Sequence, residues 1–288
     1  MKPSAIAWTD YSGGIWNIVT GCTPADRSCA NCYARAIYTR FGRDFGTEIW
    51  PDKLARWATA KLPTTSPKRG EGHRPMVFVV DMGDLFHETV PDKFIGDAID
   101  AMIHRQDVTW QILTKRPERM AGFMQTWQDA YRGYGGWYEE EYGDIAFPPP
   151  NLWLGTSICD QETADERIPI LLETPAAVRF VSVEPMLERI GLSYCKYHEY
   201  SPTYCTQCSG QEHLCHGWLD SIDWVICGAE SGPKRRPFDA AWALDLYEQC
   251  REAQVPFFYK QGSALHPGQA AVLPGHGVVQ EWPEEGER

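Results

Sequence analysis

The sequence predicts an α/β fold built as a partial or full (β/α) barrel. Short apolar runs of strand length alternate with stretches of helical periodicity along most of the chain. The apolar runs are continuous, which is typical of parallel strands buried on both faces. Polar residues or glycines follow most of these apolar runs. Reactive side chains therefore gather at the carboxyl ends of the strands, where (β/α) barrels have their active sites. A doubly wound sheet is the alternative that this pattern leaves open.

The order of these segments gives the domain organisation. Strands are predicted at 16–20, 77–81, 109–113, 152–155, 179–183, 224–227 and 256–259. Helices are predicted at 30–41, 91–105, 117–131, 163–173 and 239–253. We expect a barrel domain at 1–262 that carries a Cys/His-rich insertion at 191–220. The remaining tail, 263–288, is acidic and rich in proline and glycine, so we expect it to be loosely ordered.

Composition and charge narrow the class of protein. A chain of 288 residues with 43% hydrophobic residues can bury a sizeable core. A net charge of −12 is unlike the basic footprint of a non-specific nucleic-acid binder. Residues 1–15 lack the apolar core of a signal peptide, and no stretch is apolar enough to span a membrane. We therefore expect a cytoplasmic protein, where ten cysteines are more often metal ligands or catalysts than disulfides.

Three cysteines in the loop after the first predicted strand, Cys22, Cys29 and Cys32, are the most informative feature. Three thiolates can bind three irons of a [4Fe–4S] cluster and leave the fourth iron open for a substrate or cofactor. A Cys-x-x-Cys pair also occurs in zinc sites, but the next histidine in the chain is His73. The pattern favours the cluster and keeps zinc as the alternative.

The cysteine loop, with Tyr33 directly after its last cysteine, resembles the cluster-binding loop of radical S-adenosylmethionine (SAM) enzymes. Six residues separate the first two cysteines, where that superfamily usually has three. The wider sequence resembles a phage- and prophage-associated three-Cys-motif family, often encoded beside a partner protein called TcmP. The motifs behind this resemblance are Trp-Asn-x-x-Thr-Gly-Cys at 16–22, Asp-Leu-Phe-His at 84–87, Leu-Thr-Lys-Arg-Pro at 113–117, Ser-Val-Glu-Pro-Met at 182–186 and Gly-Ala-Glu-Ser-Gly at 228–232.

The resemblance implies a chemistry and leaves the substrate open. In radical SAM enzymes the open iron chelates SAM, an external electron donor reduces the cluster, and a 5′-deoxyadenosyl radical removes hydrogen from the substrate. A nucleobase, nucleotide or nucleic acid is the expected substrate class, because phages often modify bases; a peptide or a small metabolite is an alternative. A TcmP-type protein is the implied partner. A non-catalytic zinc-binding adaptor is the alternative from another class.

The resemblance also implies roles for residues at strand ends. Tyr33 would flank the adenine of the cofactor, and Asp84 would accept from its methionine amino group. Arg116 would bind the cofactor carboxylate through two hydrogen bonds. Turn capping by Asp84 and a surface salt bridge of Arg116 are the alternatives.

Further candidates follow the later strands. Ser157 and Glu184 suit ribose hydroxyls, and Gly228 permits the close approach of a planar base. Local hydrogen bonding in loops is the alternative for the polar ones. Three residues are candidates for a catalytic role: His87, Glu230 and Lys260.

The insertion contains a second group of potential metal ligands. Its cysteines are Cys195, Cys205, Cys208 and Cys215, and His198, His213 or His216 are alternative ligands. A small segment with few apolar residues can be held by a metal in place of a core. Structural zinc, an auxiliary iron–sulfur cluster and unligated thiols all remain open. The isolated Cys159, Cys227 and Cys250 are predicted to be small core residues.

Overall fold

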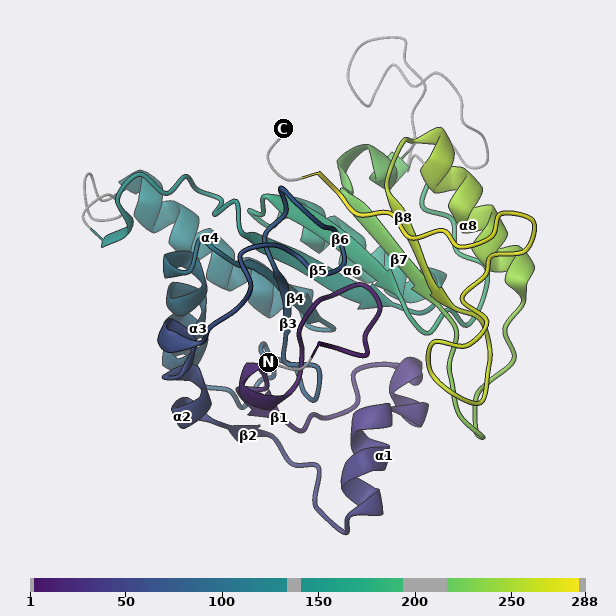
Figure 1. The fold of residues 1–288 in the computed structure, drawn as a ribbon, viewed down its shortest axis with the longest axis horizontal. Coiled ribbons are helices and arrows are strands. Elements are labelled where there is room, and N and C mark those ends of the chain that lie inside the picture. Colours follow the sequence, from purple (N-terminus) through teal and green to yellow (C-terminus); the bar gives the residue numbers. More distant parts are fainter. Residues whose placement is uncertain (1–2, 134–140, 194–216, 285–288) are drawn as a thin grey trace. The chain divides into compact units, whose positions relative to one another are not determined.

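The computed structural model describes residues 3–133, 141–193 and 217–284 (Figure 1). The chain divides into two compact units. The first contains the chain up to Thr156 together with Glu173–Val178, and the second contains Ser157–Leu172 and Arg179–Glu284. None of the described helices combines the length and the apolar character that crossing a membrane requires.

The protein has an α/β fold whose main sheet has six strands in the order β3-β4-β5-β6-β7-β8. The strands are β3 (Met76–Val79), β4 (Thr109–Thr114), β5 (Leu152–Ile158), β6 (Val178–Val183), β7 (Trp224–Gly228) and β8 (Phe257–Gln261). In the first unit β4 pairs in parallel with β3 and β5, and in the second β7 pairs in parallel with β6 and β8. Neighbours in the sheet are consecutive in the chain, which is the order of a partial (β/α) barrel. A doubly wound sheet reverses its order at a switch point, so that alternative is wrong.

From β3 onward helices alternate with these strands as the sequence predicts, and in the described chain two further α-helices precede β3. The α-helices are α1 (Tyr33–Arg40), α2 (Pro51–Leu54), α3 (Asp92–His104), α4 (Pro117–Gly133), α6 (Gln161–Glu173) and α8 (Ala240–Glu252). Short 3₁₀ helices lie at Gly14–Trp16, Arg27–Asn31, Trp57–Thr59 and Gly217–Ser221. The predicted start of α8 is confirmed, because the side chain of Asp239 accepts from the backbone N–H of Ala241 at 2.9 Å.

The first predicted strand differs from the expectation. Only β1 (Val19–Thr20) is extended, and it pairs antiparallel with β2 (Glu48–Ile49) outside the six-stranded sheet. Gly13 and Gly14 have φ values of 69° and 54°, a conformation that ends a strand. The 3₁₀ turn that follows buries Trp16 beside Trp57 and Trp110, with ring centroids 5.8 and 5.7 Å away. The chain still runs along β3, touching it at the isolated parallel bridges Tyr11–Val77 and Gly21–Gly83.

In the second unit, the segment after β8 returns to the sheet and contacts β7 and β8. Helix α8 packs on β7 and β8. Gln280 forms an antiparallel bridge with Phe258, and the indole of Trp224 donates to the Glu281 carbonyl at 2.8 Å. The described part of the tail is therefore tied to the sheet, contrary to the expectation of loose order. Leu273 and Val279 are buried and supply the apolar contacts that its polar composition concealed.

Candidate functional site

Two glycines bring the cysteine loop against the end of β3. The Gly21 N–H donates to the Met82 carbonyl at 2.9 Å. Gly21 has a φ of +83°, and a Cβ there would lie 1.9 Å from the carbonyl oxygen of Gly46. A Cβ on Gly83 would lie 3.0 Å from the carbonyl oxygen of Gly21. Both positions need glycine for this approach, which places Cys22, the next residue, beside the loop that follows β3.

The three cysteines of this loop are free thiols of intermediate exposure. Cys29 lies in the 3₁₀ helix Arg27–Asn31, which Asp26 caps by accepting from the Ser28 N–H at 2.8 Å. Cys32 directly precedes α1. Among the described residues, the three sulfur atoms do not form a group that lies wholly within 4.8 Å. Tetrahedral zinc with bonds of about 2.3 Å needs sulfurs about 3.8 Å apart, whereas a cluster binds each cysteine at a different iron. The three sulfurs are therefore not arranged around a single ion, which a cluster does not require.

Arg116, directly after β4, makes the most contacts with the loop. Its Nη1 donates to the Cys22 sulfur at 3.5 Å and to Asp84 Oδ2 at 3.2 Å. Its Nη2 donates to the carbonyl and hydroxyl oxygens of Thr23 at 3.3 and 2.9 Å. Its Nε donates to Glu88 Oε2 at 3.0 Å. Protein atoms therefore engage every nitrogen of the guanidinium group that the sequence assigned to the cofactor carboxylate.

Asp84 is buried and joins the ends of β3 and β4. Its Oδ1 accepts from the Thr114 hydroxyl at 2.7 Å and from the Phe86 N–H at 3.0 Å. Its Oδ2 accepts from the Lys115 N–H at 3.2 Å and from Arg116. Each carboxylate oxygen thus has two protein donors, which is the arrangement of a side chain that orients its neighbours.

Lys115 and His87 hold other points of the loop. Lys115 Nζ donates to the Ser28 hydroxyl at 2.8 Å and lies 3.5 Å from Asp26 Oδ2. Each nitrogen of the His87 ring lies 2.9 Å from a threonine hydroxyl, Nε2 from that of Thr23 and Nδ1 from that of Thr89. Burial, and next the charge of Arg116, lower the pKa of His87. The ring is neutral and almost wholly buried, so the structure gives it a bridging position between two loops.

Electrostatics at Cys22 oppose a free thiolate. Burial, followed by the charge of Asp84, raises the pKa of Cys22 to about 11, although Arg116 acts in the opposite direction. A free Cys22 is therefore protonated at neutral pH, and ligation of a metal there displaces a proton.

The start of α1 lies against the residues that follow β3. The Tyr33 hydroxyl donates to the Asp81 carbonyl, while 56% of the residue surface is exposed. Asn17 Nδ2 donates to Asp81 Oδ1 at 2.5 Å, and Asn17 Oδ1 accepts from the Met82 N–H at 3.3 Å. Val80 has a φ of 64°, which a β-branched residue rarely adopts. This strained turn directs the backbone of Asp81 toward the tyrosine.

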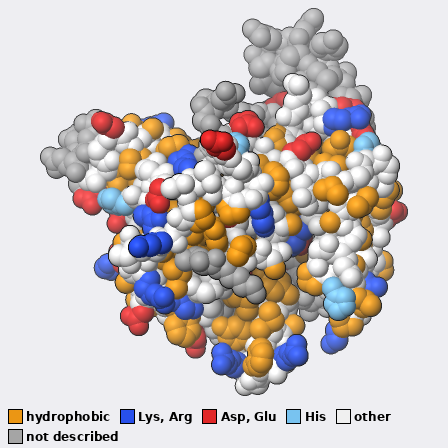
Figure 2. Space-filling view, viewed as in Figure 1, with side chains coloured by type: hydrophobic (Ala, Val, Ile, Leu, Met, Phe, Trp, Pro, Cys, Tyr) orange, Lys and Arg blue, Asp and Glu red, His pale blue; other side chains and the backbone are white. Residues whose placement is uncertain are grey.

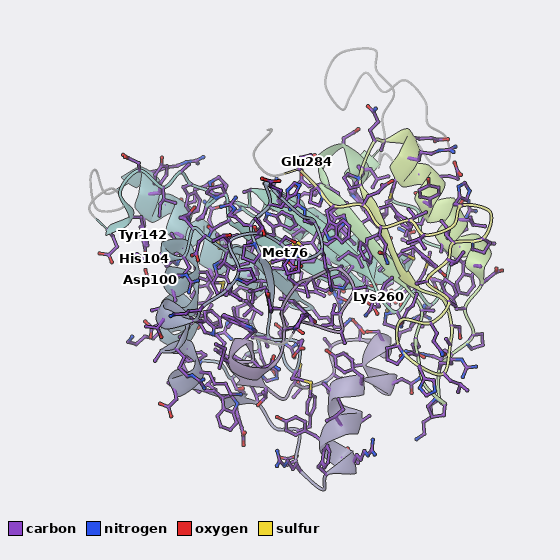
Figure 3. All side chains as sticks on the ribbon, in the orientation of Figure 1. Met76, Asp100, His104, Tyr142, Lys260 and Glu284 are labelled. Carbon is purple, nitrogen blue, oxygen red and sulfur yellow. The ribbon has the colours of Figure 1, made fainter. Side chains whose placement is uncertain are left out.

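The predicted residues of the second unit form a separate group around β7. Lys260, labelled in Figure 3, makes an ion pair with Glu184, the residue after β6. A Cβ on Gly228 would lie 3.5 Å from Glu184 Cδ and from Lys260 Cβ, so the pair crosses β7 directly over this glycine. Ser157 lies nearby, its hydroxyl 3.4 Å from the Glu184 carbonyl oxygen.

Glu230, the remaining catalytic candidate, is bound within its own loop. Its Oε2 accepts from the Arg236 N–H at 2.7 Å, and its Oε1 accepts from Arg236 Nε at 3.0 Å. The Glu230 side chain is 9% exposed. This bidentate pair closes the loop after β7.

Comparison with known proteins assigns a family. The model of DUF5131, a family described as proteins of unknown function, matches residues 3–274. The chain belongs to the DUF5131 family. A search of curated proteins found no match. Two solved structures of spore photoproduct lyase show a distant likeness that covers 86% of this chain and 75% of theirs. The complex with dinucleoside spore photoproduct is 10% identical with a TM-score of 0.39, and a mutant with bound AdoMet and the same compound is 12% identical with a TM-score of 0.41.

In this DUF5131 protein the structure brings together Cys22, Asp84, His87 and Arg116, all four of which the sequence singled out. Sequence reasoning missed Lys115 as a contact of the loop, and it missed Asn17. Both lie in quoted motifs, but their partners are more than sixty residues away in the chain. The narrower resemblance to the three-Cys-motif family, with its TcmP-type partner, stays a prediction.

The second cysteine group lies outside the described residues of the DUF5131 chain. Among the described ones, Asp100, His104 and Glu141 place one potential ligand atom each within 4.8 Å of the others. Figure 3 labels Asp100 and His104 beside Tyr142, whose hydroxyl donates to Asp100 Oδ1 at 2.6 Å. No sequence pattern indicates this group, because Glu141 is distant in the chain from Asp100 and His104. His104 lies 3.5 Å from Asp100 one helical turn away, and exposed acidic groups commonly gather in this way without a metal.

Proposed function

We propose that the protein is a radical SAM enzyme that binds a [4Fe–4S] cluster at Cys22, Cys29 and Cys32. The observation that carries the proposal is the geometry of this loop: three free thiols, not gathered within 4.8 Å around one point, beside a cationic hydrogen-bond donor. When bound, the cluster and SAM supply reductive cleavage of a carbon–sulfur bond and abstraction of a hydrogen atom. An external protein supplies the electron.

The protein's own residues bind and orient these groups. The exposed ring of Tyr33, held by its hydroxyl on the Asp81 carbonyl, is available to stack on the adenine of SAM. Asp84 and Arg116 support the cysteine loop, because protein partners already occupy their hydrogen-bonding groups. We therefore revise their assigned roles from direct cofactor binding to positioning.

The second unit, taken by itself, contains the other residues that the sequence assigned to the cofactor. Glu184 accepts a hydrogen bond from Lys260 and keeps further acceptor capacity for a ribose hydroxyl. Gly228 has no side chain, so a planar base can approach β7 beside the Glu184–Lys260 pair, and the Ser157 hydroxyl is a further candidate contact. His87 and Glu230 are enclosed by protein contacts, which leaves Lys260 as our candidate for proton transfer.

A single-stranded nucleic acid is the substrate class that we propose. The only buried residue of α1 is Ala34. Tyr33, Ile37 and Phe41 recur every four residues and are 56%, 42% and 68% exposed. Figure 2 shows hydrophobic side chains gathered over α1, with Lys and Arg at the margin. The segment 33–43 contains three arginines and no acidic residue, in a chain of net charge −12.

Because Tyr33 is proposed for the adenine of SAM, Phe41 is the ring of this face that can stack on a base of the strand, and the cations beside it suit phosphates. Arg40 and Arg43 have no ion-pair partner among the described residues, so both remain available to phosphates. Because α1 begins directly after Cys32, a strand bound there would lie next to the cluster loop. A peptide or a small metabolite remains the alternative substrate class within the same chemistry.

Anaerobic reconstitution tests the proposal. We expect about four irons per chain, and 5′-deoxyadenosine upon addition of SAM and dithionite. Replacing Cys22, Cys29 and Cys32 by alanine should abolish both signals, while Cys250→Ala, which removes a buried thiol elsewhere, should keep them. A loaded cluster that releases no 5′-deoxyadenosine contradicts the proposal. Zinc without iron in anaerobically purified protein favours the adaptor function in its place.

Fluorescence anisotropy with single-stranded oligonucleotides tests the substrate class. The double variant Arg40→Gln/Arg43→Gln should bind about tenfold more weakly and lower the slope of log K against log salt by roughly 1.4 units. Arg251→Gln, on the exposed surface of α8, is the matched control. Equal affinity of the double variant and the control would remove nucleic acid from the proposal.

A further inference from the structure

The unusual spacing of the cysteine loop coincides with two adjacent cations. Six residues, Thr23–Ser28, separate Cys22 from Cys29. Arg116 contacts the beginning of this stretch at Thr23, and Lys115 contacts its end at Ser28 and Asp26. Both side chains are largely buried, at 15% and 23% exposure. One dipeptide at the end of β4 therefore holds both ends of the extra residues.

The three cysteines differ in their surroundings. The Cys22 sulfur accepts from Arg116 Nη1 at 3.5 Å, whereas the Cys29 thiol faces a carboxylate oxygen of Asp26 at 3.8 Å. Among the described contacts, Arg116 on Cys22 is the one cationic donor to a cysteine sulfur of this loop. Asp84 Oδ2 holds the same Nη1 at 3.2 Å, which fixes the direction of the donor.

A fixed cation beside a thiolate ligand changes the metal that it holds. An N–H donor withdraws charge from the sulfur and stabilises the reduced, more negative cluster, which raises its reduction potential. Outer hydrogen bonds of this kind also retain the metal, and their loss typically costs 10- to 100-fold in affinity. The ammonium group of a lysine would carry the same charge as Arg116. It lacks the planar guanidinium fork that reaches the Cys22 sulfur, the Asp84 carboxylate and Thr23 together.

We propose that Arg116 is a positioning residue that donates to the Cys22 sulfur in the cluster-bound protein, raising the reduction potential of the cluster and retaining the iron held by Cys22. Lys115 fixes the distal end of the expanded loop through Ser28 and Asp26. The inference rests on the proposed function, since it presumes that the loop binds a cluster.

The test compares Arg116→Gln, Arg116→Lys and Lys115→Gln with the wild type after anaerobic reconstitution. We expect the midpoint potential, followed by electron paramagnetic resonance during a redox titration, to be more negative in Arg116→Gln and intermediate in Arg116→Lys. Iron should be lost to a chelator roughly 10- to 100-fold faster from Arg116→Gln. Lys115→Gln should lose iron faster at an unchanged potential.

Two controls separate this contact from general effects. Glu88→Gln removes an exposed partner of Arg116 and leaves the sulfur contact, so it should keep the wild-type potential. Arg189→Gln removes a cation from a surface pair with Asp245, and it should behave as wild type. Circular dichroism of the metal-free variants verifies folding. If Arg116→Gln folds but loads no iron, the result supports the role of Arg116 in retaining iron. The midpoint potential is then measured in Arg116→Lys.

The outcomes distinguish a failure of this inference from a failure of the proposed function. A wild-type potential and wild-type iron retention in Arg116→Gln overturn this inference while the cluster itself stands. A wild-type protein that loads no cluster under the same conditions overturns the proposed function instead.

Discussion

Gly21 and Gly83 lie backbone to backbone, and this contact carries Cys22 to the end of β3. The two residues form an isolated parallel bridge, and the Gly21 N–H donates to the carbonyl of Met82. A side chain on either residue would push the cysteine loop away from the strand. The chain segment before the cysteines forms little regular strand, so this contact and the Tyr11–Val77 bridge replace the ladder that a longer strand would provide.

Gly21→Ala should therefore damage both the fold and the site. Its Cβ would lie 1.9 Å from a backbone oxygen at a φ of +83°, and we expect a loss of about 3 kcal/mol or more in the free energy of unfolding. Gly14→Ala is the matched control: it has a φ of +54° and open space around it, so about 1 kcal/mol is expected. Urea denaturation measures both. Equal losses would show that the close approach is unimportant.

Asp84 should act as the buried connection between β3 and β4. Asp84→Ala leaves the Thr114 hydroxyl, two backbone N–H groups and Arg116 without their acceptor, so we expect a loss of about 3 kcal/mol. Asp97→Ala removes an exposed partner of Lys93 and should cost about 0.5 kcal/mol. Thermal melts of the metal-free proteins give the comparison. A loss at Asp84 no larger than at Asp97 contradicts this connecting role.

The sequence was sufficient for elements whose signal is local. The predicted β4 and α4 are confirmed to within two residues at each end, because continuous apolar strands and a proline at a helix start are visible without neighbours. The prediction of a strand before the cysteines is wrong because Trp16 packs against distant tryptophans and because Gly13 and Gly14 adopt positive φ values. A local apolar pattern shows neither effect. The same holds for the tail, where two buried apolar residues outweigh a polar composition.

For the site residues too, the sequence predicts which side chains are candidates but not which distant residues they contact. The position of Arg116 after a strand made it a candidate, but its partners, Cys22 and Glu88, lie 94 and 28 residues away. Residue type and place in a strand therefore identified the side chain, whereas its engagement by protein atoms required the fold. For the same reason the sequence predicts a cofactor contact for Asp84, three of whose four donors come from residues that only the fold brings to it.

Substitution of Gly228 should affect cofactor binding more than folding. A Cβ there would meet Glu184 and Lys260 at ordinary contact distances, so Gly228→Ala should change the free energy of unfolding by less than about 1 kcal/mol. If a planar base lies over β7, the methyl group should weaken SAM binding to the reconstituted protein about tenfold. Isothermal titration calorimetry measures this, with Gly122→Ala on α4 as the control. Unchanged SAM affinity would remove Gly228 from the cofactor site.

Asp81 should make the protein less stable as the pH rises from acid to neutral. Burial raises the pKa of Asp81 above its ordinary value of 3.8, while hydrogen bonds from Asn17 and Ser12 oppose the shift. A raised folded-state pKa gives stability that is complete below the unfolded value and is lost as the pH rises through the folded value. Asp81→Asn cannot titrate, so its stability relative to the wild type should increase between about pH 3.5 and 7.

Urea denaturation across this pH range tests the effect, with Asn17→Ala as the informative companion. Removing the amide takes away a donor that favours the charged carboxylate, so the pKa of Asp81 should rise further and the pH-dependent loss should become larger. The double variant Asn17→Ala/Asp81→Asn should lose that extra dependence. If the difference between wild type and Asp81→Asn is the same at every pH, the carboxyl of Asp81 is not the group that burial perturbs.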